Sequence, residues 1–159
     1  MNLAKDFFDS GFELYKFLTQ KSQVKNVTKR FLIREIRNNL KRLEHRNKQG
    51  ANKYSIIQKL ENESIVRALS EGYNFNKLVS RREVTADLAE KLKNAKRYIG
   101  WDAERIVNSI DEKIVSLKEI VEIYEAENIE QINITSRLNN LFTLLLLLTL
   151  LMHKENSKT

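Results

Sequence analysis

Residues 138–154 read LNNLFTLLLLLTLLMHK, and this stretch decides the fold. Within it, residues 141–152 carry no charge and contain only two threonines among leucine, phenylalanine and methionine. In the chain as a whole, 31% of the residues are charged, so the run differs sharply from its surroundings. Such a segment must leave water, either in a lipid bilayer or beneath other parts of a folded protein.

The length of the run favours a buried position in a soluble protein. Twelve residues of α-helix extend about 18 Å, whereas the hydrocarbon layer of a bilayer is about 30 Å thick. Extending the helix towards the N-terminus would include Arg137, Asn139 and Asn140, which are costly in lipid. We therefore expect a core helix rather than a transmembrane anchor.

A helix that is apolar on every side has to be covered on every side. Other helices of the same chain can surround it, or a second copy can cover the part that they leave bare. We expect the second arrangement, a homo-oligomer that forms through Leu141, Leu144, Leu145, Leu148 and Leu151. The alternative is a central helix in a monomeric bundle.

The segment at 103–127 has the most regular apolar pattern in the sequence. Its apolar residues are spaced alternately by four and three positions: Ala103, Val107, Ile110, Ile114, Leu117, Val121 and Tyr124. This heptad repeat predicts a helix that packs against another helix running alongside. Ile106, Ile120 and Ile123 widen the apolar side, which indicates a bundle interior rather than an isolated coiled coil.

The remaining sequence predicts four further helices and no strand. Apolar periodicity places them at about 2–19, 24–47, 55–71 and 80–99. Ser55 with Gln58 and Ser80 with Glu83 fit capping boxes that open the last two.

These segments together predict an all-α protein. Proline, which ends helices, is absent. We expect a single-domain bundle of about six helices over residues 1–153, followed by a polar tail over 154–159. The heptad-patterned helix 103–127 and the leucine-rich C-terminal helix would form its spine.

Charge is unevenly distributed along the chain, whose net charge is +7. Residues 1–60 carry 14 Lys and Arg against 5 Asp and Glu, which gives +9. Residues 61–100 carry 8 against 6 (+2), and residues 101–159 carry 6 against 10 (−4). A basic first part and an acidic last part predict a charged partner.

Within the basic part, cations recur on one side of the predicted helix 24–47. This basic row consists of Lys29, Arg30, Arg34, Arg37, Lys41 and Arg42. From Arg30 to Lys41 its members are spaced by four, three and four residues, and one further cation is adjacent at each end. A one-sided row of this kind is typical of a surface that binds an acidic partner, such as a nucleic acid. The alternatives are a solvated helix face and a face that docks on the acidic C-terminal part of the same chain.

The sequence lacks the residues or motifs of several classes of active site. The chain has no cysteine, so disulfides, thiolate nucleophiles and zinc–thiolate sites are excluded. Its four glycines build none of the phosphate-binding glycine motifs, and no nucleophile elbow occurs. Neither His45 nor His153 belongs to the Glu-x-x-His motif of metal-binding helix bundles. We therefore predict no catalytic residue, no metal site and no cofactor.

These observations favour a non-enzymatic, cytoplasmic interaction or scaffold protein. It would self-associate through the leucine-rich helix and present the basic face of residues 21–48 to an acidic protein or nucleic acid. The cytoplasm is expected because acidic residues interrupt the first apolar segment, which therefore does not resemble a signal peptide.

Two alternative functions stay open. The first is a membrane-associated effector that uses the leucine-rich helix and the basic face at an anionic bilayer. The second is a helical enzyme with an unrecognised site, for which Arg37 and His45 are the best candidates.

Overall fold

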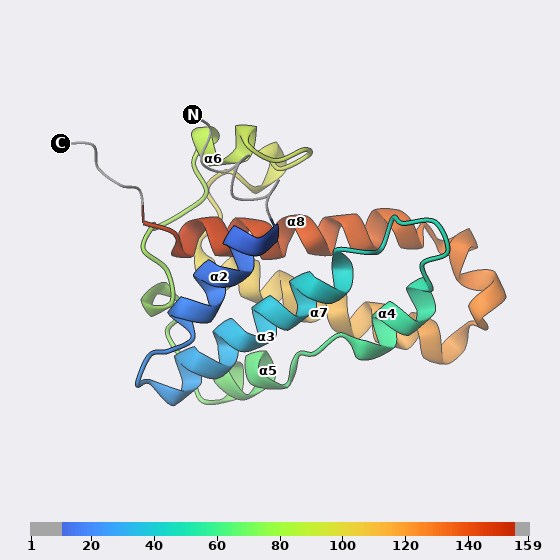
Figure 1. Cartoon of the computed structure of the whole chain (residues 1–159), viewed down its shortest axis with the longest axis horizontal. Coiled ribbons are helices and arrows are strands. Elements are labelled where there is room, and N and C mark those ends of the chain that lie inside the picture. Colours follow the sequence, from blue (N-terminus) through green and yellow to red (C-terminus); the bar gives the residue numbers. More distant parts are fainter. Residues whose placement is uncertain (1–10, 155–159) are drawn as a thin grey trace.

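The computed structural model describes residues 11–154 and confirms the all-α fold (Figure 1). Its elements are, in chain order, α2 (Gly11–Lys21), α3 (Val27–Leu43), α4 (Lys53–Lys59), α5 (Glu63–Ser70), η1 (Phe75–Lys77), α6 (Ala86–Glu90), η2 (Lys96–Tyr98), α7 (Ala103–Ile123), η3 (Ala126–Ile132) and α8 (Ile134–Met152). The described residues form no strand, and one isolated bridge joins Glu83 to Asp102. Apart from Lys154, the predicted polar tail lies outside the described residues.

The two longest helices, α7 and α8, lie side by side along the long axis of the molecule (Figure 1). α3 packs on α8 and α5, α2 packs on α3, and α4 packs on α7. The predicted spine of the heptad-patterned helix and the leucine-rich helix is therefore present, with the shorter helices arranged around it.

The leucine run of α8 is buried by the chain itself. Residues 144–152 are all buried, and each of the five leucines predicted to form the assembly surface has 0% of its surface exposed: Leu141, Leu144, Leu145, Leu148 and Leu151. The structure thus has the central-helix arrangement that the sequence analysis gave as the alternative. Because these five leucines have no exposed surface, they do not offer an assembly surface in this structure, and a homo-oligomer would have to form through other residues.

By length and composition, α8 is also the one described helix that could cross a membrane. Of its apolar 18-residue window, 61% is buried inside the protein, and core helices of soluble proteins pass the same test. Its apolar surface has the protein environment that α3 and α7 provide.

The heptad pattern of α7 describes its buried side, but the helix is shorter than predicted. Its heptad positions from Ala103 to Val121 are buried. Ile123 is 75% exposed and Tyr124 is 44% exposed. The helix ends at Ile123 because Tyr124 has an extended backbone (φ −103°, ψ 142°), so the last predicted turn to 127 is absent.

The predicted helix 55–71 is two helices, α4 and α5. Leu60 has an extended backbone (φ −61°, ψ 140°), which separates them. Asn52 rather than Ser55 caps α4, since its side chain accepts a hydrogen bond from the Ser55 N–H at 3.0 Å. The predicted capping box at Ser55 is therefore wrong, because the helix begins two residues earlier.

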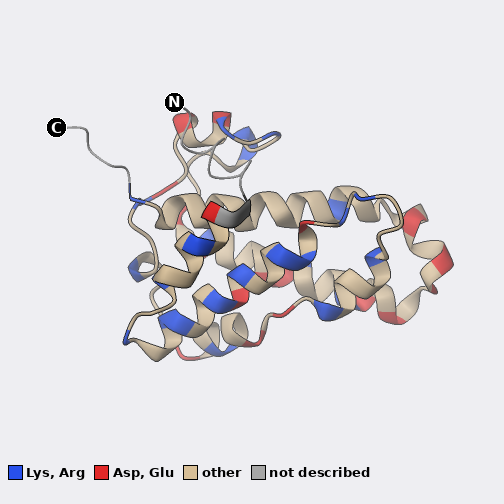
Figure 2. Cartoon of the chain, viewed as in Figure 1, with Lys and Arg blue, Asp and Glu red and all other residues tan. Residues whose placement is uncertain are grey.

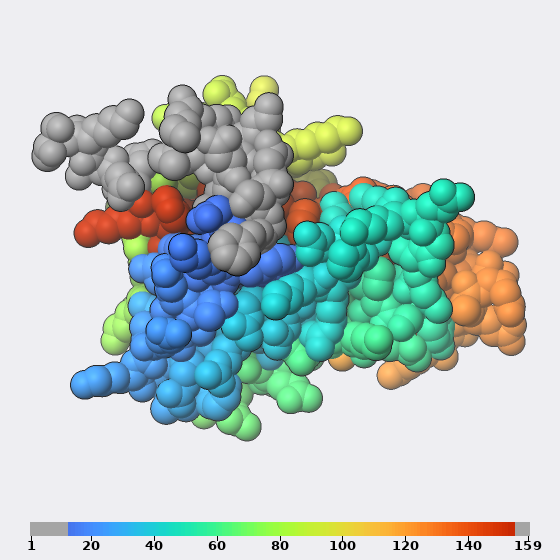
Figure 3. Space-filling model, in the orientation of Figure 1, coloured from blue at the N-terminus to red at the C-terminus, as the bar shows by residue number. Residues whose placement is uncertain are grey.

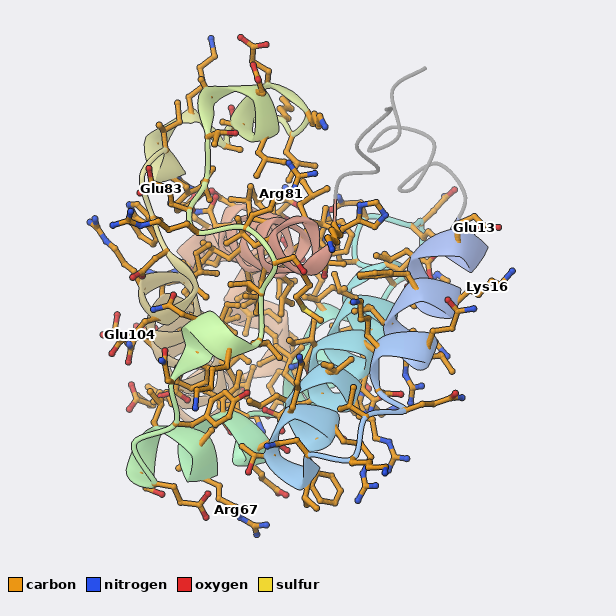
Figure 4. The ribbon with its side chains drawn as sticks, turned by 90° about the vertical axis from the view of Figure 1, so that its left-hand side faces the viewer. Glu13, Lys16, Arg67, Arg81, Glu83 and Glu104 are labelled. Carbon is orange, nitrogen blue, oxygen red and sulfur yellow. The ribbon has the colours of Figure 1, made fainter. Side chains whose placement is uncertain are left out.

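The predicted helix 80–99 is also wrong, since only α6 and η2 are helical there. Thr85 caps α6 by accepting from the Leu88 N–H at 3.3 Å. The N–H groups of Ser80 and Arg81 both donate to the Leu151 carbonyl, at 2.9 and 3.0 Å. These bonds satisfy a carbonyl group at the end of α8, and Figure 4 shows Arg81 beside that helix. Because the N–H groups of Ser80 and Arg81 bond to α8, residues 80 and 81 do not begin a helix.

Candidate functional site

The predicted basic row lies on the outer side of α3. The opposite side of α3 is buried in the core. Arg34 and Lys41 are exposed, and the other four members of the row, Lys29, Arg30, Arg37 and Arg42, are partly exposed. Figure 2 shows Lys and Arg recurring along α3 and on α2, on the same face of the molecule. None of the six cations therefore belongs to the buried side of α3.

Some members of the row have partners within the chain. Arg42 pairs with Glu61 at 3.3 Å, and Arg37 donates to the Thr19 hydroxyl at 3.2 Å. The Lys41 ammonium lies 5.2 Å from the centre of the Tyr15 ring. Within the described part of the chain, the side chain of Arg34 has neither a hydrogen bond nor an ion pair. Arg34 and Lys41 are consequently the members most available to a partner.

An acidic surface occupies the end of the molecule formed by the last turn of α7 and by η3. This acidic end comprises the exposed residues Glu119, Glu122, Glu125, Glu127 and Glu130, and residues 119–136 contain no Lys or Arg. Figure 2 shows its glutamates at the right-hand end of the view. The exposed Ile123 and Tyr124 lie among them.

The basic row and the acidic end do not neutralise each other within one molecule. The ion pairs between described residues are Arg42–Glu61 and Lys53–Glu130, and neither joins α3 to the acidic end. The N-terminal half of α3 and the acidic end lie at opposite ends of the long axis (Figures 1 and 3). The two charged surfaces are therefore both displayed.

The structure also contains a polar contact that the sequence analysis missed, on the buried side of α3. Glu35 is 5% exposed, and its carboxylate accepts hydrogen bonds from the N–H groups of Ser64 (2.7 Å) and Ile65 (3.1 Å). The N-cap residue of α5, Asn62, makes no side-chain capping bond, so Glu35 caps that helix from α3. Burial raises the pKa of Glu35, although both N–H groups favour its ionised form.

Asn39 completes this contact one turn further along α3. Its side chain donates to the Glu61 carbonyl at 2.7 Å and accepts from the Glu61 N–H at 2.8 Å. Together, Glu35 and Asn39 hold the junction between α4 and α5. We call this pair the α3 clamp, and its role is structural.

A polar cavity of about 480 Å³ lies between α7 and α8. One side of α7 and the first turns of α8 line it: Ser109, Glu112, Lys113, Ser116, Leu117, Asn133, Ser136, Arg137 and Asn140. Three of these residues are serines, whose short side chains leave space between helices that pack closely elsewhere. The cavity therefore opens beside the polar N-terminal half of α8.

A second cavity, of about 840 Å³, adjoins the first. It is bounded by the segment 89–97 and shares Ser136 and Asn140 with the first cavity. We call the two together the α8 groove. Its lining contains four cations, Lys96, Arg97, Lys113 and Arg137, against the two carboxylates Glu90 and Glu112.

The cations of the α8 groove are close enough to influence one another. Burial lowers the pKa of Lys113, and the charges of Arg97 and Arg137 lower it further, while Glu112 acts in the opposite direction. Arg97 is held in place by a 2.7 Å hydrogen bond to Asn140, and Arg137 by a 3.2 Å bond to the Ile132 carbonyl. The α8 groove therefore has positively charged side chains close together, beside neutral polar side chains.

The candidates for catalysis and metal binding are dispersed. In the described ranges, no three His, Asp or Glu side chains come together in an arrangement that could hold a metal ion. Arg37 is directed to Thr19 of α2, and His45 is exposed beyond the end of α3.

The sequence matches no protein-family model, and neither a curated protein nor a solved structure is similar to it. Its function therefore has to be inferred from its own surfaces and cavities.

Proposed function

We propose that this chain is a non-enzymatic interaction protein that self-associates through charge, with the acidic end of one copy docking on the basic row of α3 in another. The observation that carries the proposal is the display of two complementary surfaces that are separated along one molecule and are not paired with each other. The acidic partner expected from the sequence is then a second copy of the chain.

Opposite charge provides the steering for such an encounter. The acidic end has five glutamates, of which Glu130 pairs with Lys53, and Arg34 and Lys41 are exposed on α3. Complementary potentials raise the rate of association and select the orientation of the partner. At about 1 M salt the Debye length falls to about 3 Å, so this contribution disappears.

Exposed apolar side chains at both surfaces supply the short-range part of the contact. Phe31 (40% exposed) and Val27 (52%) accompany the cations of α3, while Ile123 (75%) and Tyr124 (44%) accompany the glutamates. Aromatic residues and arginine are enriched in protein interfaces, where arginine also stacks on aromatic rings. An acidic protein surface with apolar side chains suits α3 better than the backbone of a nucleic acid, which offers phosphate and sugar but no apolar side chain.

The two surfaces differ, so the contact is heterologous. Each copy uses its acidic end for one neighbour and its basic row for another. Repetition of such a contact gives a ring if the rotation closes and an open filament if it does not. The expected assembly is therefore concentration-dependent and weakened by salt.

Charge exchange tests the proposal. We expect wild-type protein to grow in mass with concentration in light scattering at about 50 mM salt, where screening is weak, and to dissociate at about 1 M. Arg34→Glu with Lys41→Glu, and separately Glu122→Lys with Glu125→Lys, should each abolish growth. Each variant alone repels its own copies, because its altered surface has the same charge as its remaining native surface. Mixing the two should restore association, because the native acidic end of the first can dock on the native basic row of the second.

The matched control is Glu104→Lys with Glu71→Lys, which reverses two exposed glutamates outside the acidic end. This double variant should assemble as the wild type does. A wild type that stays monomeric at every concentration in low salt overturns the proposal. If that monomer binds nucleic acid and Arg34→Glu with Lys41→Glu prevents it, the acidic partner is a nucleic acid instead.

A further inference from the structure

We propose that the α8 groove is a binding site for a small phosphorylated molecule, with Lys113, Arg97 and Arg137 as the residues that hold the phosphate. This inference is independent of self-association, because none of the three residues belongs to the basic row or to the acidic end. It assigns a ligand class to a cavity that no sequence motif marks.

Each cavity of the α8 groove has the size of a small-molecule pocket. Ligand pockets typically occupy about 300–1,000 Å³. The cavity between α7 and α8 has about 480 Å³, and the adjoining one has about 840 Å³. Leu117 and Leu92 provide one apolar side chain in each, and nearly all other lining side chains are polar. The site is therefore built for a polar ligand.

The charge of the groove points to an anion. Lys113, Arg97 and Arg137 come from α7, η2 and α8, so three different elements bring their charges together. In the described part of the chain, none of the three forms an ion pair within 4.0 Å. Burial is the main cause of the lowered pKa of Lys113, and the charges of Arg97 and Arg137 lower it further, which agrees with their placement around the α8 groove. An anion between them would relieve that repulsion.

The neutral groups favour phosphate over a single carboxylate. Ser109, Ser116 and Ser136 supply hydroxyl donors, and Asn140 supplies an amide that already orients Arg97. Phosphate has more acceptor oxygens than a carboxylate, and arginine binds it through two parallel hydrogen bonds. The first turn of α8 borders the same cavity, and the positive end of its dipole adds to the attraction.

The two carboxylates of the groove restrict the rest of the ligand. Glu112 lines one cavity and Glu90 the other, so neither cavity is purely cationic. Carboxylates repel long polyanions and accept hydrogen bonds from hydroxyl or amino groups. The preferred ligand is thus a phosphate ester with hydroxyl groups, such as a sugar phosphate, rather than an extended nucleic acid backbone.

Titration calorimetry with ribose 5-phosphate, inorganic phosphate and ribose tests this inference on the full chain. We expect ribose 5-phosphate to bind, inorganic phosphate to bind more weakly and to compete with it, and ribose alone not to bind. Lys113→Gln and Arg137→Gln should each weaken binding about tenfold or more, since each removes a charged donor to phosphate. Backbone amide signals at Ser109, Ser116 and Ser136 should shift in NMR spectra on titration.

Lys118→Gln is the matched control, because it removes the same charge from α7 at a position outside the groove lining. It should bind ribose 5-phosphate as the wild type does. The inference fails if all three variants lose affinity equally, which indicates nonspecific attraction to a basic protein, or if no phosphate probe binds at millimolar concentration. Because the charge-exchange variants of α3 keep the groove, their affinity for ribose 5-phosphate separates this inference from the proposed self-association.

Discussion

α8 and α3 are both core helices, yet they are held in place by different forces. From residue 141 onwards α8 is apolar on all sides, and its two threonines bond to carbonyl groups of their own helix, at Asn139 and Leu145. α3 is apolar on one side only, and that side includes the α3 clamp of Glu35 and Asn39. Both helices are well buried. The polar contacts that α8 makes with the segment at 80–81 lie at its C-terminal end, whereas α3 makes polar contacts in the middle of its buried side.

The difference concerns energy and specificity. The free energy gained by burying apolar surface is large and does not depend on direction. A run of leucines therefore stabilises the fold without specifying which helical turn packs against which neighbouring helix. A buried hydrogen bond adds less net free energy but is costly to leave unmade, and it has a defined geometry. α8 accordingly provides a large part of the burial energy, whereas the α3 clamp fixes where α4 ends and α5 begins.

The largest effect is expected in α8. Leu148→Glu places a charge where the wild-type side chain is 0% exposed, and we expect the chain not to fold. Leu148→Ala should lower the free energy of unfolding by about 2–5 kcal/mol, and Leu148→Met by less than about 1.5 kcal/mol. Urea denaturation followed by circular dichroism measures all three. A folded monomeric Leu148→Glu would mean that the leucine run is an external surface.

A smaller effect is expected from the α3 clamp. Glu35→Ala leaves the N–H groups of Ser64 and Ile65 without their acceptor, and we expect a loss of about 2–3 kcal/mol in the free energy of unfolding. Hydrogen exchange should also become faster in α5 than in α8. Glu71→Ala, at an exposed position, is the control and should change stability by less than about 0.5 kcal/mol. Equal effects of the two changes would show that Glu35 does not act as a cap.

The smallest effect is the pH dependence of the same carboxylate. Because burial raises the pKa of Glu35, the folded chain holds a proton there more tightly than the unfolded chain does. The stability that this proton contributes is present below the ordinary pKa of glutamate and is lost as the pH rises through the raised pKa. The side chain of the Glu35→Gln variant does not titrate at this position. The free energy of unfolding of the wild type minus that of the variant should therefore fall as the pH increases from about 4. A difference that rises with pH would contradict the direction of the shift.

The features that sequence predicted well depend on local periodicity. The heptad spacing of α7 and the leucine run of α8 are readable within a few turns, and both define the core. Asp102, a residue type that favours the N-cap position, caps α7 by accepting from the Arg105 N–H at 2.9 Å. The existence of these two helices and their buried sides follow from neighbouring residues alone, although α7 ends four residues before the predicted end at 127.

The features that sequence did not predict depend on residues far apart in the chain. The break at residues 60–62 is held by Asn39 and Glu35, and the segment at 80–81 is held by Leu151. The α8 groove combines Arg97, Lys113 and Arg137, which no local pattern brings together. A partial signal was present, since Ser109, Glu112, Lys113 and Ser116 form a polar strip beside the heptad positions of α7.

The position of α8 in the chain has a consequence for protein synthesis. The helix around which the others pack is the last of the described helices to be translated, and the Leu151 carbonyl is the acceptor that holds the segment at 80–81. Ribosomes add about 5–20 residues per second, so the 19 residues of α8 take on the order of one to four seconds to emerge. During that time the inner sides of α3 and α7 lack their cover. Nascent chains that have not yet reached residue 134 are therefore the species most exposed to aggregation and most dependent on chaperones.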